Sequence, residues 1–183
     1  MEVFEWIGRL VWFFLPAGLA NMSPVLIAKH WQWLAQPIDG GHQLFGQPIF
    51  GSNKTWRGLL VGTLFGGALF SIQKLLAIIF PKFLELGVYD YRLFPWWFGF
   101  AFGAAALLSD LIKSFFKRRF RIAPGALWFP FDQVDYLIGP TLLIHWFYPV
   151  NALTWLIVLS LGIILHVVVN RLGYRWHFKA TPW

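Results

Sequence analysis

The sequence contains no cysteine, so disulfide scaffolds, thiolate metal sites and cysteine nucleophiles are excluded. Charged residues are scarce as well: they make up 13% of the chain, against about a quarter in an average soluble protein. The sequence also lacks the glycine period of collagen and any repeat of about 20 to 50 residues. Because 58% of the residues are hydrophobic, a soluble globular protein is excluded too.

Aromatic residues are abundant, and positive charge is in excess. The 183 residues include 12 Trp, 5 Tyr and 20 Phe, a composition that excludes a disordered chain. The formal net charge of +7 is spread through mostly apolar sequence, so we expect no nucleic-acid partner. Membrane topology explains this charge better, and the expected partner is the lipid bilayer.

Long apolar stretches dominate the chain, and a helix needs roughly 20 residues to cross a hydrocarbon core of about 30 Å. Five stretches approach this length: 3–20, 58–80, 93–112, 136–150 and 152–169. The first could be a signal peptide, but acidic Glu2 and Glu5 stand where a basic leader is expected. Gln73 and Lys74 lie near one end of the second stretch, where they can snorkel. We therefore predict an all-α integral membrane protein with five transmembrane helices in one membrane domain, residues 1–183.

The distribution of Lys and Arg predicts the orientation of these helices. Most of the 15 Lys and Arg residues fall in 21–57, 113–133 and 170–183. Four lie elsewhere: Arg9, Lys74, Lys82 and Arg92. The positive-inside rule therefore places the basic segments in the cytoplasm, with the N-terminus outside and the C-terminus inside. The two cytoplasmic loops then cover about 21–57 and 113–135 of a protein of the cell membrane.

The first loop contains several glycines and ends in a basic segment. Lys54, Thr55 and Arg57 directly precede the second apolar stretch, so two cations and a hydroxyl group meet a helix N-terminus. This combination favours phosphate binding. Alternatively, Lys54 and Arg57 only flank a membrane helix. The segment lacks the glycine spacing of a P-loop, which argues against a Walker-type ATPase.

Acidic and basic residues also lie on both sides of the second loop. Asp110, Lys113 and Lys117 are spaced i, i+3 and i+7, so they share one face if the third helix continues through them. Asp132 and Asp135 lie at the start of the fourth stretch. Converging carboxylates suit a hard cation such as Mg²⁺, and the lysines can neutralise phosphate oxygens. Alternatively, Asp132 is a helix cap and Asp135 a solvated acid.

Glycines and histidines inside the apolar stretches are interpreted as structural residues. His145 and His166 are expected to form hydrogen bonds within the helix bundle. The glycines have the spacing of close helix packing, in which small residues let two backbones approach. These packing glycines are Gly58, Gly62, Gly66, Gly99 and Gly103.

Several motifs of the two loops occur together. In the first loop they are Asn21-x-x-Pro24-Val25, Pro37-Ile38-Asp39-Gly40, Gly46 and Lys54-Thr55-Trp56-Arg57-Gly58. Around the second loop they are Ser109-Asp110, Lys113, Lys117-Arg118-Arg119 and Asp132-Gln133-x-Asp135. On these motifs the chain resembles the CDP-archaeol synthase family, integral membrane cytidylyltransferases related to phosphatidate cytidylyltransferases. Residues 47–50 and Ser109 depart from the family pattern.

The resemblance implies a five-helix fold whose two cytoplasmic loops enclose a charged cavity. It also implies CTP and an anionic lipid phosphate as substrates, Mg²⁺ as cofactor, and a CDP-lipid and pyrophosphate as products. On this basis Asp132 and Asp135 are expected to bind Mg²⁺, with Asp110 completing the site. The other candidates are Lys54, Arg57, Lys113 and Lys117 for phosphate, Asn21, Asp39 and Thr55 for the nucleotide or its loop, and Arg118 and Arg119 for substrate or inner-leaflet head groups.

Two other classes of protein stay open at this point. A small transporter or channel would use the inner aspartates as ion ligands, although transport sites usually lie near the membrane midplane. A non-catalytic assembly subunit would use the basic loops to bind anionic lipids.

Overall fold

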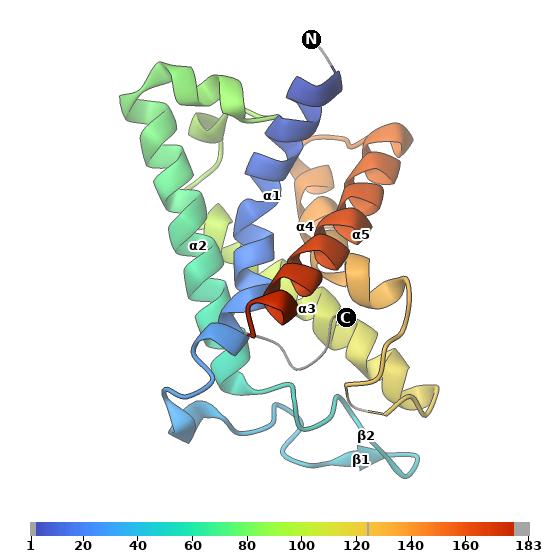
Figure 1. The fold of residues 1–183 in the computed structure, drawn as a ribbon. Coiled ribbons are helices and arrows are strands. Elements are labelled where there is room, and N and C mark those ends of the chain that lie inside the picture. Colours follow the sequence, from blue (N-terminus) through green and yellow to red (C-terminus); the bar gives the residue numbers. More distant parts are fainter. Residues whose placement is uncertain (1–2, 124, 178–183) are drawn as a thin grey trace.

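The computed structural model describes residues 3–123 and 125–177, and most of them are helical (Figure 1). Residues 178–183 of the predicted cytoplasmic C-terminal segment, and Glu2, lie outside the described residues. The elements are α1 (Val3–Leu26), η1 (Gln32–Leu34), β1 (Gln43–Leu44), β2 (Gln47–Pro48), α2 (Trp56–Ile79), η2 (Pro81–Leu86), η3 (Tyr91–Leu93), α3 (Phe98–Arg119), α4 (Phe131–Phe147) and α5 (Ala152–Arg175). The predicted helical class is thus confirmed.

The long helices differ in how well they suit a bilayer. Among the described residues, three helices are long and apolar enough to cross a membrane: α2, α3 and α5. Helix α1 has 24 residues but contains Glu5, Arg9, Pro16 and Pro24. Helix α4 has 17 residues, which give about 25 Å of rise and fall short of a hydrocarbon core of about 30 Å.

The helix bounds differ from the predicted stretches at the end of the molecule that carries the β-hairpin. Helix α1 continues to Leu26, so Asn21 and Pro24 lie on a helix and not in the first loop. The hydroxyl group of Ser23 donates to the Ala20 carbonyl 3.0 Å away, which satisfies this polar side chain within the helix. Helix α3 continues through its charged residues to Arg119, where basic side chains suit a helix C-terminus.

Side-chain caps set the starts of two helices. The Thr55 side chain accepts a hydrogen bond from the Gly58 N–H group, at 3.2 Å, and begins α2. Asn151 does the same for α5 through the Thr154 N–H group, at 2.8 Å. Both caps follow directly from the sequence, because a polar residue precedes each apolar run.

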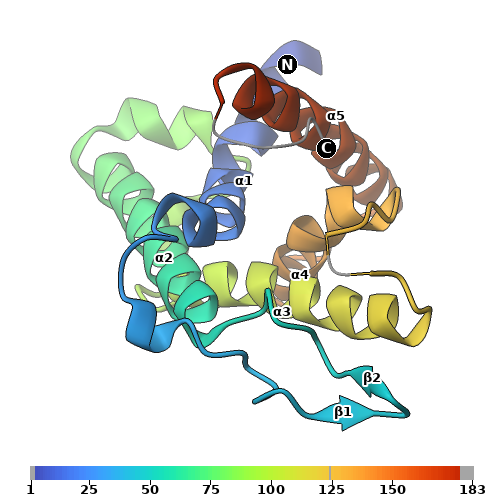
Figure 2. The same cartoon turned by 60° about the horizontal axis from the view of Figure 1, so that its bottom comes forward.

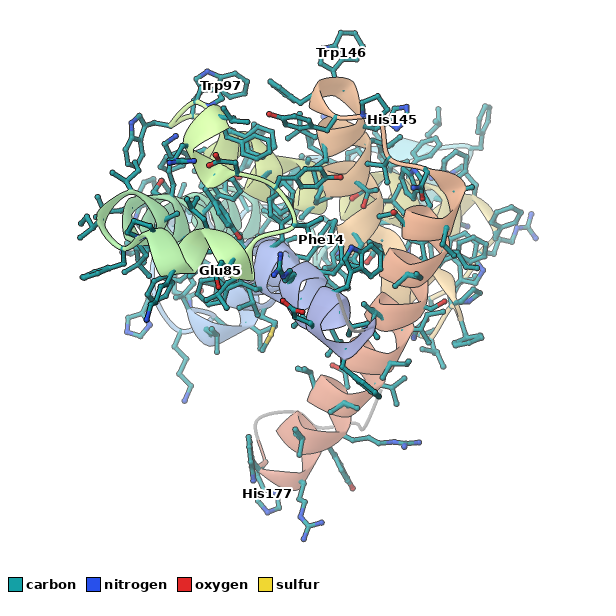
Figure 3. The ribbon with its side chains drawn as sticks, turned by 90° about the horizontal axis from the view of Figure 1, so that it is seen from above. Phe14, Glu85, Trp97, His145, Trp146 and His177 are labelled. Atoms are coloured by element: carbon teal, nitrogen blue, oxygen red, sulfur yellow. The ribbon has the colours of Figure 1, made fainter. Side chains whose placement is uncertain are left out.

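The core is a cluster of aromatic rings between α1, α2 and the first half of α3. Phe13, Phe70, Phe98 and Phe102 are fully buried, and Phe70 lies 5.2 to 6.0 Å from the other three, measured between ring centroids. Rings at this separation stabilise the interior beyond their area of burial. Figure 3 looks onto the end that this cluster occupies and shows Trp97 and Trp146 pointing outward from its edge.

Contrary to the prediction from the sequence, Lys74 does not extend its side chain to the membrane interface. Its side chain is buried, and its Nζ donates to the carbonyl groups of Tyr91, Arg92 and Phe94 at 3.1, 3.0 and 2.6 Å. Three carbonyl oxygens replace the water that the ammonium group loses on burial. Lys74 thus joins α2 to the chain segment that leads into α3.

Glycines bring α1, α2 and α3 close together. A Cβ atom on Gly62 would lie 2.6 Å from the Ala20 carbonyl oxygen of α1, and one on Gly66 would lie 3.0 Å from Cα of Gly103 on α3. The close packing predicted for these glycines is confirmed. Gly58 differs, because a Cβ atom there would meet Pro24 at an ordinary 3.5 Å.

The substitution Gly62→Ala tests this packing. We expect it to lower the free energy of unfolding by roughly 1 to 3 kcal/mol, because the methyl group meets a backbone carbonyl that cannot turn aside. The matched control is Gly18→Ala, where a Cβ atom meets nothing within 4 Å. The measurement is thermal unfolding in detergent, and equal melting temperatures for the two variants would contradict the packing.

Candidate active site

A polar cavity of about 290 Å³ opens among the helix ends at the hairpin end of the molecule, which Figure 2 brings forward. Four of the five long helices and the first loop contribute polar side chains to it, and the second loop contributes Gly125, Ala126 and Leu127. The polar residues that carry the argument below are Asn21 of α1, Asn53 and Lys54 of the first loop, Asp110, Lys113, Ser114, Lys117 and Arg118 of α3, Asp132, Gln133 and Asp135 of α4, and His166 and Asn170 of α5.

Helix α3 supplies one charged face to this cavity. Asp110, Lys113 and Lys117 all line it, as the predicted common face of the third helix requires. Asp110 and Lys117 are buried, with 8% and 6% of their surface exposed. Charged groups this deeply buried need partners, so their pairing determines the local structure.

The ammonium group of Lys113 lies among three carboxylates. Its Nζ is 3.1 Å from Asp110 Oδ1, 2.7 Å from Asp132 Oδ1 and 2.7 Å from Asp135 Oδ2. Lys117 adds a second cation, with Nζ 2.8 Å from Asp132 Oδ2. The structure therefore brings Asp110 together with the Asp132 and Asp135 pair, from two helices joined by a long loop.

The first loop enters the same cluster through Lys54. Its Nζ forms an ion pair with Asp110 Oδ2. Asp110 thus lies between Lys54 and Lys113, one from the loop and one from its own helix. Lys54, Lys113, Lys117 and Arg118 outnumber Asp110, Asp132 and Asp135 by one, so the cavity is slightly cationic and suits a polyanion.

Asp39 organises the first loop and does not line the polar cavity. Its carboxylate accepts hydrogen bonds from the N–H groups of Gly41, Phe50 and Gly51, at 3.1, 2.9 and 3.0 Å. Burial raises the pKa of this carboxyl group, but these hydrogen bonds outweigh burial and hold its pKa below the usual value. The charged carboxylate therefore fixes Phe50 and Gly51, which do line the cavity.

Arg57 and Arg119 hold loops and do not line the polar cavity. Arg57 donates to the carbonyl groups of Ala28 and His30, at 2.8 and 3.1 Å, and so joins the start of α2 to the chain that leaves α1. Arg119 donates to carbonyl groups of the hairpin, including that of Gln47 at 3.1 Å. The predicted phosphate and head-group roles of these two arginines therefore gain no support from their positions.

Arg118 and Thr55 each line a cavity and also form a hydrogen bond that holds the local structure. Arg118 lines the polar cavity, and its guanidinium group donates to the Ala123 carbonyl at 3.3 Å. Thr55 caps α2 and lines a second cavity, of about 180 Å³, which adjoins the first. Both residues can therefore contact a bound substrate.

Ser109 connects α3 to the turn of α4 that carries Asp135. Its hydroxyl group donates to the Asp135 carbonyl oxygen at 2.6 Å, and the Gly139 N–H group points to the same hydroxyl at 3.3 Å. In an α-helix the Asp135 carbonyl would normally accept a hydrogen bond from the Gly139 N–H group, four residues later. The Ser109 hydroxyl group contacts both of these groups of α4. Ser109 therefore fixes the position of Asp135 along α4 relative to α3.

Several cavity residues were not among the predicted site residues. Gln133 lies inside the Asp132-Gln133-x-Asp135 motif, and Asn53 directly precedes the motif that begins at Lys54, so both are sequence neighbours of predicted site residues. His166, interpreted from the sequence as a bundle residue, and Asn170 lie on the cavity wall. They are four residues, about one helical turn, apart in the mostly apolar α5, and this spacing places both on one face of the helix.

The residues of the cavity fit a metal ion in part. Within residues 3–123 and 125–177, no group of three or more His, Cys, Asp or Glu side chains is arranged to hold one. The three predicted ligands converge on the Lys113 ammonium group instead, and Asp132 is further engaged by Lys117 and the Trp128 N–H group. Asp110 and Asp135 still present hard carboxylate oxygens to the cavity. Two carboxylates are enough for Mg²⁺ when phosphate oxygens and water supply the other ligands.

The chain matches one family along almost its whole length. The family model described as CarS-like, CDP-archaeol synthase, matches residues 3–183. A CDP-archaeol synthase of Thermococcus onnurineus is 35% identical over 177 residues, with 94% of each chain covered. That of Sulfurisphaera tokodaii is 31% identical over 186 residues, with 100% of each chain covered.

A solved structure is also similar. It is described as "Structural insight into an intramembrane enzyme for archaeal membrane lipids biosynthesis" and superimposes with a TM-score of 0.67 at 28% identity. The match covers 87% of this chain and 91% of that chain.

The substitution Lys113→Met tests whether this lysine holds the carboxylate cluster together. We expect a loss of about 3 to 5 kcal/mol in the free energy of unfolding, because three carboxylates, two of them buried, lose their common cation. The control is Lys29→Met, at an exposed position after α1. Thermal unfolding in detergent reports the difference. A melting temperature of Lys113→Met equal to that of the control would show that the cluster does not depend on Lys113.

Proposed function

Because the chain belongs to the CDP-archaeol synthase family, we propose that the polar cavity is where it transfers a cytidylyl group to a lipid. The protein is a lipid cytidylyltransferase, an enzyme that uses CTP to form a CDP-lipid. The observation that carries the proposed site is the convergence of Lys54, Lys113 and Lys117 with three aspartates in one cavity.

The reaction needs charge compensation more than a strong base. An oxygen of the lipid phosphate attacks the α-phosphorus of CTP, the bond from that phosphorus to the bridging oxygen of the β-phosphate breaks, and pyrophosphate leaves. A phosphomonoester has a second pKa of about 6, so near neutral pH it is already largely a dianion with no proton to remove. Two polyanions must therefore be held together and aligned.

We assign the phosphate contacts to the lysines of the cavity. Lys54 comes from the loop, and Lys113 and Lys117 come from α3, so they approach a bound triphosphate from different elements. Asp132 holds both α3 lysines, at 2.7 and 2.8 Å from the nearer oxygens, and restricts their motion. Cations that are already oriented stabilise developing charge without reorganising during the reaction.

Asp110 and Asp135 are the proposed ligands of Mg²⁺. Both line the cavity and both contact Lys113, so a phosphate group that draws Lys113 away leaves their oxygens available. When bound, Mg²⁺ neutralises and orients triphosphate oxygens. Asp132, predicted from the sequence as a ligand, is better explained as the partner of the two lysines.

The proposed topology has five crossings, with the cavity on the cytoplasmic side. Helix α1 packs against α2 and α3, and α4 packs against α3 and α5. Helices α2, α3 and α5 suit a bilayer by length and composition. The cavity end carries Lys54, Lys113 and Lys117, and the positive-inside rule places such an end in the cytoplasm, where CTP is available. The N-terminus of α1 lies at the opposite end (Figure 1), which corresponds to an external N-terminus.

Isosteric removal of the ligand charges tests the assigned site. We expect Asp110→Asn and Asp135→Asn each to lower turnover by roughly 100-fold or more, the scale of losing one oriented electrostatic contact in a catalytic site. The assay incubates purified protein with radiolabelled CTP, Mg²⁺ and a panel of lipid phosphates, and counts label in the organic phase. Glu85→Gln, an exposed acid at the opposite end, is the charge-matched control (Figure 3). Wild-type turnover in both aspartate variants would remove this assignment.

Metal removal tests the cofactor separately. With EDTA we expect label transfer to stop and to return when Mg²⁺ is added in excess. The same titration can be followed by thermal unfolding, where CTP is expected to stabilise the wild-type protein only when Mg²⁺ is present. In Asp135→Asn, the Mg²⁺ concentration that gives half of the maximal stabilisation by CTP should rise. Undiminished transfer in EDTA would show that the enzyme works without a divalent ion.

A further inference from the structure

The exposed apolar side of α3 continues past the end of the helix. Leu108, Ile112 and Phe116 are spaced by four residues, and 49%, 59% and 49% of their surfaces are exposed. This spacing places them on one side of a helix that is long and apolar enough to cross a membrane. Phe120, the next residue of the series, directly follows α3 and is 66% exposed. The side of α3 that suits contact with hydrocarbon therefore extends to the start of the second loop.

Exposed aromatic rings carry this apolar surface across the second loop. The ring centroids of Phe120 and Trp128 lie 5.6 Å apart, and those of Trp128 and Phe131 lie 4.5 Å apart. Phe129 and Phe131 are 61% and 47% exposed. We call Phe120, Trp128, Phe129 and Phe131 the aromatic patch. A contiguous apolar group on the surface of a protein marks a contact surface, because its exposure to water is unfavourable.

Arg121 follows this surface in a backbone conformation that favours glycine. Its φ is 58°, in the left-handed region. The Arg121 N–H group donates to the Arg118 carbonyl at 3.0 Å, and the Ile122 N–H group donates to the Lys117 carbonyl at 3.1 Å. These two bonds form a Schellman motif, in which glycine is the usual left-handed residue because it has no Cβ atom. The arginine side chain is therefore not required to end α3.

The Arg121 side chain is exposed, and within residues 3–123 and 125–177 it forms no hydrogen bond or ion pair. The exposed acids in this described part of the chain are Glu5 in the first turn of α1 and Glu85 in η2. Both elements lie at the end of the molecule away from the hairpin (Figure 1). The charge exposed beside the aromatic patch is therefore positive, and it complements an anionic lipid surface.

We propose that the aromatic patch and Arg121 dock onto the bilayer surface at the hairpin end, with the rings below the head groups and the guanidinium group on anionic head groups. Interfacial segments typically combine Trp and Phe with Lys and Arg in this way. The continuity of the patch with the exposed apolar side of α3 favours the bilayer over a protein partner. This inference goes beyond the proposed function, because it concerns the surrounding membrane and not the substrates.

The docked surface is joined to the wall of the polar cavity. The Trp128 N–H group donates to Asp132 Oδ2 at 2.6 Å, and Gly125, Ala126 and Leu127 of the same loop line the cavity. A second loop that is held on the bilayer at both ends therefore keeps this wall in place.

The lack of cysteine allows a site-specific test with one introduced thiol. Ala123→Cys, at an exposed position of the second loop, is labelled with a fluorophore, and the protein is placed in nanodiscs. The nanodiscs contain phosphatidylcholine alone or an equal mixture with phosphatidylglycerol, and each carries a lipid with a nitroxide quencher near its head group. We expect quenching to be roughly twofold or more stronger in the anionic membrane, because anionic head groups attract the cation. High salt should remove the difference by screening exposed charges.

The substitution Arg121→Gly, made in the labelled protein, separates lipid binding from folding. Glycine suits the left-handed conformation, so the melting temperature should equal or exceed that of the labelled parent protein. The difference in quenching between the two membranes should disappear. Phe120→Ser should lower quenching in both membranes. Lys82→Gln, which removes an exposed cation at the opposite end, is the matched control and should change neither quenching value.

Three results would overturn the proposal. Equal quenching in the two membranes, or an unchanged difference in Arg121→Gly, would show that Arg121 does not bind anionic lipid. No quenching in either membrane would show that the loop lies away from the bilayer and would assign the aromatic patch to a protein partner. If Arg121→Gly does not fold, Arg121→Asn decides by the same criteria, because Asn also tolerates the left-handed conformation. The assay contains no CTP, so its failure is distinct from failure of the proposed function.

Discussion

The site depends on one ammonium group surrounded by three carboxylates. Lys113 of α3 contacts Asp110 on its own helix and Asp132 and Asp135 on α4, all within 3.1 Å. These charges lie at the end of an apolar bundle, where an unpaired ion is costly. The pairing therefore fixes how the end of α3 and the start of α4 sit together, and with them the long loop between these helices.

The same cluster explains why the cavity suits two anionic substrates. Its lysines are held by carboxylates, and the first loop brings Lys54 to Asp110. Asp39 keeps that loop in place through three backbone N–H groups. Charge and position are thus set before substrate binds, which reduces the reorganisation that the reaction requires.

The sequence predicted much of the site because local spacing controls it. Asp110, Lys113 and Lys117 share a face by helical periodicity, and the structure confirms that they line one cavity. Other predictions failed where a polar side chain found a partner inside the fold. Ser23 bonds within α1, which continues through residues predicted as loop, and Lys74 binds three carbonyl groups instead of extending to the interface.

The sequence by itself determined the membrane class, the helical periods and the loop motifs that carry the charges. Only the tertiary structure decided that Lys113 lies at the centre of the aspartates, that Arg57 and Arg119 hold loops, and that Ser109 bridges to α4. The reason is physical: periodicity and capping act over a few residues, whereas the partner of a buried charge is set by which helix ends meet.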